Sequence, residues 1–151
     1  MESNGMPNIT HADIVIDADR AKIMGVIADL DQYPQWSEGV TGVEVLTRTD
    51  DGRPDTARFN FASGPIKDVF VLKYHWNGDD SVSWELTEGK VLTKEQGTYA
   101  LTSHSDGRIK VTYDLEVGLS IKVPGIVRRQ AEKKIVNTAL EGLKLRVESL
   151  A

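Results

Sequence analysis

Hydrophobic and polar residues alternate along most of the chain, with the two-residue period of a strand that buries one face. The first alternating stretch runs from Ile9 to Asp17, and six more follow between positions 40 and 118. Short polar turns separate these six, as at residues 50–53, where an Asp-Gly pair tolerates a positive φ. No turn is long enough to hold a crossover helix, so the pattern predicts an antiparallel sheet.

Two segments have the spacing of an amphipathic helix instead. The first follows Asp17 and Asp19, either of which is a candidate N-cap, and Pro34 ends it or begins a second short helix. The second, residues 125–149, follows Pro124 and contains no proline. About 25 helical residues span roughly 37 Å, which is enough to cross a whole sheet. Its apolar positions recur at a regular spacing: Val136, Leu140, Leu143, Val147 and Leu150.

These elements predict an α+β fold in which about seven antiparallel strands form a curved sheet wrapped round the long C-terminal helix. Two short helices follow the first strand, and we expect the first strand to pair with the last. The length of 151 residues fits one domain, which we place at residues 9–151 after a flexible tail of residues 1–8.

The composition removes several kinds of chemistry. The chain has no cysteine, which excludes disulfides, thiolate catalysis and cysteine-based zinc sites. Its three histidines, His11, His75 and His104, are dispersed, so we expect no metal, and no motif indicates a cofactor. The net charge of −5 disfavours bulk binding of nucleic acid. No apolar run could span a bilayer and no signal peptide is evident, so a cytoplasmic location is expected.

The charge is unevenly distributed. Residues 122–134 carry +4, whereas the rest of the chain carries −9. One interpretation is a solvated helix face. The other is a patch that docks an acidic partner, such as an acyl carrier protein, or an anionic membrane surface. The candidate docking residues are Arg128, Arg129, Lys133 and Lys134.

The order of the elements, together with several short motifs, resembles the polyketide cyclase/dehydrase and lipid-transport group of the START-like (SRPBCC) superfamily. The resemblance covers about residues 9–150 and implies a helix-grip fold with a deep pocket for an apolar or aromatic ligand. It does not imply one activity, because the superfamily includes carriers, receptors and cyclases. The residues that carry it are Asp17-Ala18, Asp29-Leu30, Tyr33-Pro34, Trp36, Gly97 with Tyr99, and Pro124-Gly125.

Most aromatic residues fall on the predicted concave face of the sheet. Their burial alone would stabilise the fold by about 1.5–3 kcal/mol each, so a packed core is one explanation. The other is an aromatic-walled pocket, enlarged by small residues of the last helix such as Ala131 and Gly142. We predict ligand contacts from Trp36 at the entrance and from Phe59, Phe70, Leu72, Tyr74, Trp84, Tyr99, Val111, Tyr113, Ile135, Thr138 and Ala139.

Candidates for catalysis are few. Asp68 shares the inward parity of its strand, and a desolvated carboxylate there could act as an acid or base, although a strand end can also face water. The hydroxyls of Tyr74 and Tyr113 could orient a ligand carbonyl, or simply pack in the core. The resemblance implies a pocket arginine in aromatase/cyclases, but parity directs Arg58 outward.

Three functions remain open. The first is binding of an apolar or aromatic small molecule, lipid-like or polyketide-like. The alternative is a metal-free polyketide cyclase/dehydratase that acts on a carrier-bound or free aromatic intermediate. The third is an interaction module without a ligand.

Overall fold

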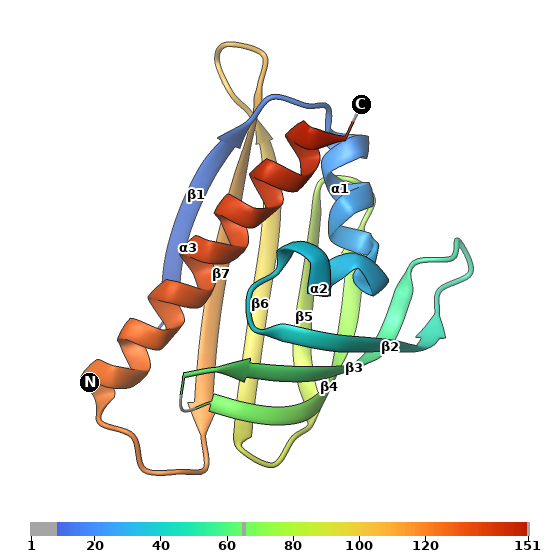
Figure 1. Ribbon diagram of the computed structural model, residues 1–151. Helices are drawn as coiled ribbons and strands as arrows, with labels where there is room; N and C mark the ends of the chain where they lie inside the picture. The colour runs from blue at the N-terminus through green and yellow to red at the C-terminus, as the bar shows by residue number, and fades with distance from the viewer. Residues whose placement is uncertain (1–8, 65, 151) are drawn as a thin grey trace, which may run out of the picture.

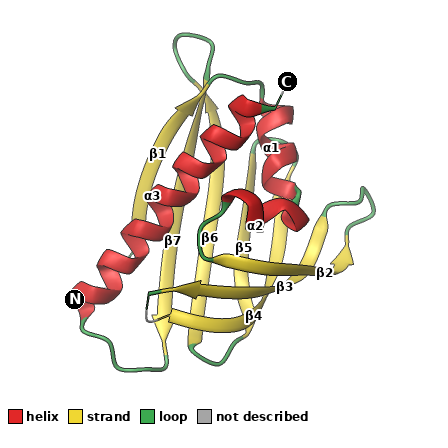
Figure 2. Cartoon of the chain, viewed as in Figure 1, coloured by secondary structure: helices red, strands yellow, loops and turns green. Residues whose placement is uncertain are grey.

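A computed structural model describes residues 9–64 and 66–150, and the predicted tail of residues 1–8 lies outside them. Seven strands and a long final helix form the fold, with short helical elements after the first strand (Figures 1 and 2). The elements in chain order are β1 (Thr10–Ile16), α1 (Arg20–Ala28), the 3-10 turn η1 (Leu30–Gln32), α2 (Tyr33–Trp36), β2 (Val40–Arg48), β3 (Pro54–Ser63), β4 (Ile66–Asn77), β5 (Ser81–Glu88), β6 (Leu92–Ser103), β7 (Ile109–Leu119) and α3 (Gly125–Ser149).

The strands form one sheet in the order β1-β7-β6-β5-β4-β3-β2, and every neighbouring pair is antiparallel. The first strand pairs with the last, so the sheet is a meander with β1 added beside β7. Figure 1 shows the sheet curving, with β2 to β4 turned across the direction of the others. The predicted helix-grip fold is therefore confirmed.

The helix α3 crosses the concave face of the sheet obliquely (Figure 1). Four of the five apolar positions predicted to face the sheet are at most 2% exposed: Val136, Leu140, Leu143 and Val147. The prediction is wrong for Leu150, which is 37% exposed. The helix ends at Ser149, and the chain turns to an extended conformation before Leu150 can continue the buried stripe.

Two local contacts fix the short helices after β1: an N-cap on α1 and a close backbone contact between α2 and α3. Of the two candidates for the cap, it is Asp19 that accepts a hydrogen bond from the Lys22 amide, at 2.8 Å, and so caps α1. The α2 backbone lies against α3 at Gly142, where an added Cβ would be 2.4 Å from the Trp36 carbonyl oxygen. Gly142 therefore permits helix contact, and does not enlarge a pocket as its small size suggested.

A pair of charged side chains attaches the first turns of α3 to β7. Val117 donates its amide hydrogen to Glu132 at 2.9 Å, and its carbonyl oxygen accepts from Arg128 at 3.0 Å. Thr10 of β1 also donates to the Glu132 carboxylate, at 3.4 Å. Glu132 is only 2% exposed, and burial raises the pKa of its carboxyl. Both backbone groups of one residue at the end of β7 are thus bonded to the helix.

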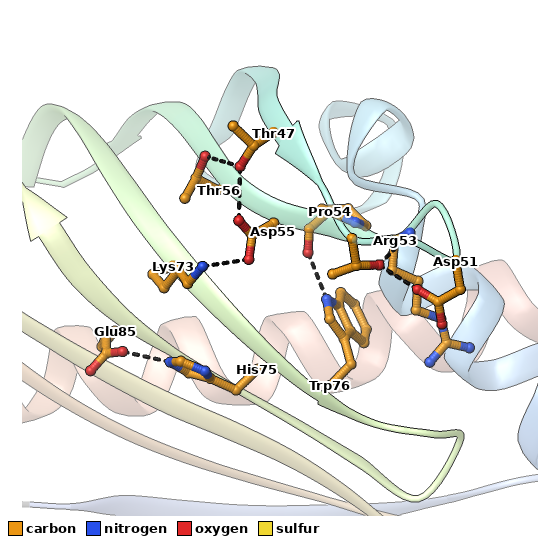
Figure 3. Close-up of polar contacts among 11 residues, drawn as sticks. Thr47, Asp51, Arg53, Pro54, Asp55, Thr56, Lys73, His75, Trp76 and Glu85 are labelled. Carbon is orange, nitrogen blue, oxygen red and sulfur yellow. Dashed lines mark hydrogen bonds and ion pairs between the residues drawn. The ribbon is translucent and has the colours of Figure 1, made fainter.

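The convex face carries the polar half of each strand. Lys73 pairs with Asp55 at 2.5 Å and His75 with Glu85 at 2.6 Å, both visible in Figure 3. His11 and His104 also pair with carboxylates at the surface. Within residues 9–64 and 66–150, no three potential metal ligands come together. No helix in this part of the chain is long and apolar enough to cross a membrane.

Candidate functional site

A pocket lies between the concave face of the sheet and α3. Nine of the twelve predicted ligand contacts line it: Phe59, Phe70, Leu72, Tyr74, Trp84, Tyr99, Tyr113, Ile135 and Ala139. It is also lined by residues that the sequence did not indicate as contacts: Tyr33, Ser37, Glu38, Val40, Phe61, Ile66, Leu92, Glu95, Leu115 and Val117. The structure therefore brings together residues from six strands, the last helix and the segment around α2.

The pocket is narrow. Its empty space is about 760 Å³ when the open mouth is included, but the cavity itself measures only about 80 Å³. The smaller volume is the room for a bound molecule, and a single water requires roughly 10–15 Å³ of it. The pocket therefore has room for several waters or a small ligand.

Aromatic rings in two groups form the wall of this pocket. The Phe59 and Phe70 rings stack with their centroids 5.6 Å apart. Further along, Trp84 lies 5.4 Å from Tyr99 and 5.7 Å from Tyr113, and the last two are 4.6 Å apart. These separations are typical of favourable ring pairs, so the rings pack against one another while they line the pocket.

Three tyrosine hydroxyls add polar atoms to this wall. Those of Tyr74, Tyr99 and Tyr113 have no hydrogen-bond partner among the described residues. Burial raises the pKa of all three phenols well above the usual value. They therefore remain protonated and can donate hydrogen bonds to a ligand, but they cannot act as phenolate bases near neutral pH.

Glu95 supplies a carboxyl group to the same pocket. It accepts a hydrogen bond from the indole nitrogen of Trp84 at 3.0 Å. Burial raises the pKa of Glu95 from 4.5 to about 7, although the bond from Trp84 opposes this change. The residue is half-buried, but it lines a largely apolar pocket, so desolvation dominates. Its carboxyl group can therefore gain or lose a proton near neutral pH.

The signal for Glu95 was present in the sequence and was overlooked. It has the same parity as Tyr99, which the sequence predicts to face the pocket. The register shift between Leu92 and Lys94 ends before Glu95, so the alternation from Glu95 to Tyr99 is regular.

Gly97 explains how Trp84 reaches Glu95. The two residues Trp84 and Gly97 pair directly across β5 and β6. A Cβ on Gly97 would lie 2.2 Å from a ring carbon of Trp84. The indole therefore lies flat over the glycine, and its nitrogen extends to the next inward residue of β6.

Three predicted contacts do not line the pocket. Val111 is fully buried in the core. The Thr138 hydroxyl donates to the carbonyl of Lys134 in its own helix at 2.6 Å. Trp36 lies against Gly142 and Tyr33. In the described part of the chain, its indole nitrogen is the one buried side-chain polar atom that has no hydrogen-bond partner.

The remaining polar candidates are bonded elsewhere. The Asp68 carboxylate accepts hydrogen bonds from the amides of Val91 at 3.0 Å and Leu92 at 2.9 Å, which orders the turn between β5 and β6. It does not line the pocket. Arg58 points outward, as its parity predicts, and pairs with Glu44 at 2.7 Å.

The four candidate docking residues have different surroundings. Arg128 is bonded to Val117 and half-buried. Arg129 and Lys133 are exposed. Lys134 lies 3.9 Å from Glu38 at the rim of the pocket. Of these exposed cations, Lys134 is therefore the one that lies beside the pocket lining.

Comparison with known proteins places this geometry among related folds. Residues 16–144 match the family model for polyketide cyclase/dehydrase and lipid transport. A START superfamily protein from Mycobacterium smegmatis has a TM-score of 0.86 at 22% identity, over 95% of this chain and 99% of that one.

Two further solved structures are similar at lower identity. An aromatase/cyclase from a Streptomyces species has a TM-score of 0.72 at 12% identity, over 93% of both chains. A STAR-related lipid transfer protein from Xanthomonas axonopodis has a TM-score of 0.72 at 17% identity, over 95% of this chain and 89% of that one. No curated protein matches the chain. At these identities the structures support the fold alone.

Proposed function

Because the chain belongs to the polyketide cyclase/dehydrase and lipid transport family, we propose that it binds an apolar or aromatic small molecule, lipid-like or polyketide-like, between the sheet and α3. The observation that carries the proposal is the aromatic-walled pocket with an open mouth and a few convergent polar groups. The fold does not choose among functions, so the proposal rests on this site.

The pocket can be tested by filling it. Ala139 lies on α3, lines the pocket and is 7% exposed. In Ala139→Phe the new ring should occupy the empty space and weaken the binding of 1-methylnaphthalene by about tenfold or more, which is about 1.4 kcal/mol. Calorimetric titration measures the affinity, and thermal melting measures stability in parallel.

Leu145→Phe is the matched control, because position 145 is on the same helix and 72% exposed. It should leave binding and stability close to wild type. A packed core predicts a different pair of results. Ala139→Phe would then cost about 1–3 kcal/mol of stability through overpacking, and wild type would not bind the hydrocarbon. That outcome would refute the proposal.

A cyclase/dehydratase is the second candidate, and the carboxyl of Glu95 is the observation that favours it. With a pKa near 7, this group could accept and return a proton at neutral pH. The tyrosine hydroxyls could then hold a carbonyl oxygen by donating hydrogen bonds. Loss of turnover in Glu95→Gln, with ligand binding retained, is the expected result for an enzyme. Asp68 is placed outside the pocket and offers less for this role.

We further propose that an exposed basic face of α3, formed by Arg129 and Lys133, docks on an anionic lipid surface. Ile126, Arg129 and Lys133 lie three and four residues apart and so share one face of α3. Ile126 is 68% exposed, and Ile121 in the preceding loop is 42% exposed. Cations beside exposed apolar side chains are typical of helices that bind a membrane interface. An acidic carrier protein could pair with the cations, but such pairing does not explain the exposed isoleucines.

A further inference from the structure

The charges that line the pocket are all of one sign. Two carboxylates, Glu38 and Glu95, are among its lining residues, and no lysine, arginine or histidine is. Glu38 lies at the rim with 60% of its side chain exposed, within 3.9 Å of Lys134. Water and that lysine compensate its charge. Glu95 has no cation beside it, so the inner part of the pocket carries an uncompensated acidic group.

The carboxyl of Glu95 also has unused capacity for hydrogen bonds. An ionised carboxylate offers about four acceptor positions. Among the described residues only the Trp84 indole donates to it. Burying a polar group with so few partners is unfavourable. A ligand that donates a hydrogen bond would remove this cost, whereas a ligand with its own carboxylate would increase it.

The surrounding rings favour the same kind of ligand. Trp84 lies within 5.8 Å, centroid to centroid, of Tyr74, Tyr99 and Tyr113. The faces of such rings attract a cation, and more strongly when the site is desolvated. An ammonium group in this pocket would therefore have both a carboxylate and several aromatic rings within the same lining.

On the premise of the binding function above, we propose that the pocket selects ligands in which an apolar or aromatic body carries a hydrogen-bond donor, above all a protonated amine, that bonds to Glu95. It rejects ligands that bring a carboxylate or phosphate to that position. Free fatty acids and acyl phosphates are thereby disfavoured, and hydrophobic amines are favoured.

The affinity for an amine should depend on pH through Glu95. The groups that face it are Trp84 of β5, Tyr74 of β4 and Tyr113 of β7, and both phenols stay protonated. The helix α3 contributes only Ile135 and Ala139 to the lining. Deprotonation of Glu95, whose pKa is about 7, should therefore strengthen amine binding as the pH rises from about 6 to about 8.

Three probes of matched size separate the possibilities: 1-naphthylmethylamine, 1-methylnaphthalene and 1-naphthoate. Calorimetric titration near pH 8 should show the amine binding about tenfold more tightly than the hydrocarbon, and the carboxylate about tenfold more weakly. In Glu95→Gln the amine should lose about tenfold in affinity and its pH dependence, while the hydrocarbon stays within about twofold. The amide oxygen of glutamine can still accept from Trp84, so the pocket should keep its shape.

Glu85→Gln removes the same charge from the opposite, convex face, where Glu85 pairs with His75. It should preserve the order of the three affinities. The inference is overturned if 1-naphthoate binds as tightly as the amine, or if Glu95→Gln leaves the preference unchanged. Hydrocarbon binding without a charge preference would refute this inference alone. No binding of any probe would refute the binding function and the inference together.

Discussion

At the scale of single residues, the site depends on one glycine. Gly97 has no side chain, so the Trp84 ring occupies the space above it. That position is what allows the indole nitrogen to reach the Glu95 carboxyl at 3.0 Å. A wall residue, a glycine and an acid on adjacent strands therefore form one unit, in which each determines the position of the next.

The raised pKa of Glu95 has a consequence for stability. Because the folded-state value of about 7 exceeds the ordinary value of 4.5, the folded protein holds this proton more tightly than the unfolded chain does. Protonated Glu95 therefore contributes to the free energy of unfolding fully below about pH 4.5, and this contribution is lost as the pH rises through about 7. The loss is at most of the order of 3 kcal/mol.

Denaturant unfolding of wild type and Glu95→Gln between about pH 5 and about pH 8 measures this loss. As the pH rises, the free energy of unfolding of wild type should fall relative to that of Glu95→Gln. Glu132, whose carboxyl also has a raised pKa, is present in both proteins and cancels in the difference. Parallel stability curves would show that Glu95 titrates normally.

At the scale of elements, the attachment of α3 to β7 depends on the pair Arg128 and Glu132. The positive residues at the start of α3 are slightly unfavourable next to the helix dipole. Arg128 is compensated by its bond to the Val117 carbonyl oxygen. The buried carboxylate of Glu132 also offsets the positive charge of Arg128, because it lies one helical turn further along α3. It accepts a hydrogen bond from the amide of Val117.

Glu132→Ala should leave the buried Val117 amide without a partner and lower the free energy of unfolding by about 1–3 kcal/mol. The adjacent exposed position supplies the comparison, since Lys133→Ala should change stability by no more than about 0.5 kcal/mol. Both values come from urea unfolding. Equal stability of the two variants would mean that Glu132 does not hold the helix to the sheet.

At the scale of the whole molecule, Lys134 connects the basic face with the pocket, since it follows Lys133 in the chain and lies 3.9 Å from Glu38 of the pocket lining. A ligand that passes between a membrane and the pocket would have a short path. Docking of this face on lipid would therefore serve the proposed binding function directly.

Co-sedimentation with vesicles of phosphatidylglycerol and phosphatidylcholine tests the docking. The double variant Arg129→Glu/Lys133→Glu should lose most of the binding, and wild-type binding should weaken as salt screens the charges. Lys110→Glu, on the far side of the sheet where Lys110 faces Asp13, is the control and should bind as wild type does. Equal binding by all three proteins would dismiss the basic face as a docking site.

Much of the fold could be predicted from the sequence because periodicity is a local property. Alternation along seven segments and the regular spacing of Val136, Leu140, Leu143 and Val147 were sufficient to predict the sheet, its antiparallel order and the helix that covers it. The outward direction of Arg58 followed from the same parity. Seven strand residues that line the pocket were also found in this way, since inward residues of a curved sheet converge on its concave side.

The tertiary structure alone decided which polar groups meet inside the pocket. Parity with Tyr99 puts Glu95 on the inward face of β6, but only its contact with Trp84 of β5 shows that its carboxyl belongs to the pocket wall. Asp68 has the inward parity, yet its carboxylate binds amides more than 20 residues away in the chain. Trp36 lies against α3 because Gly142, over 100 residues later, admits its backbone. Periodicity reports the face of an element on which a residue lies. Contacts between distant segments decide what that residue touches.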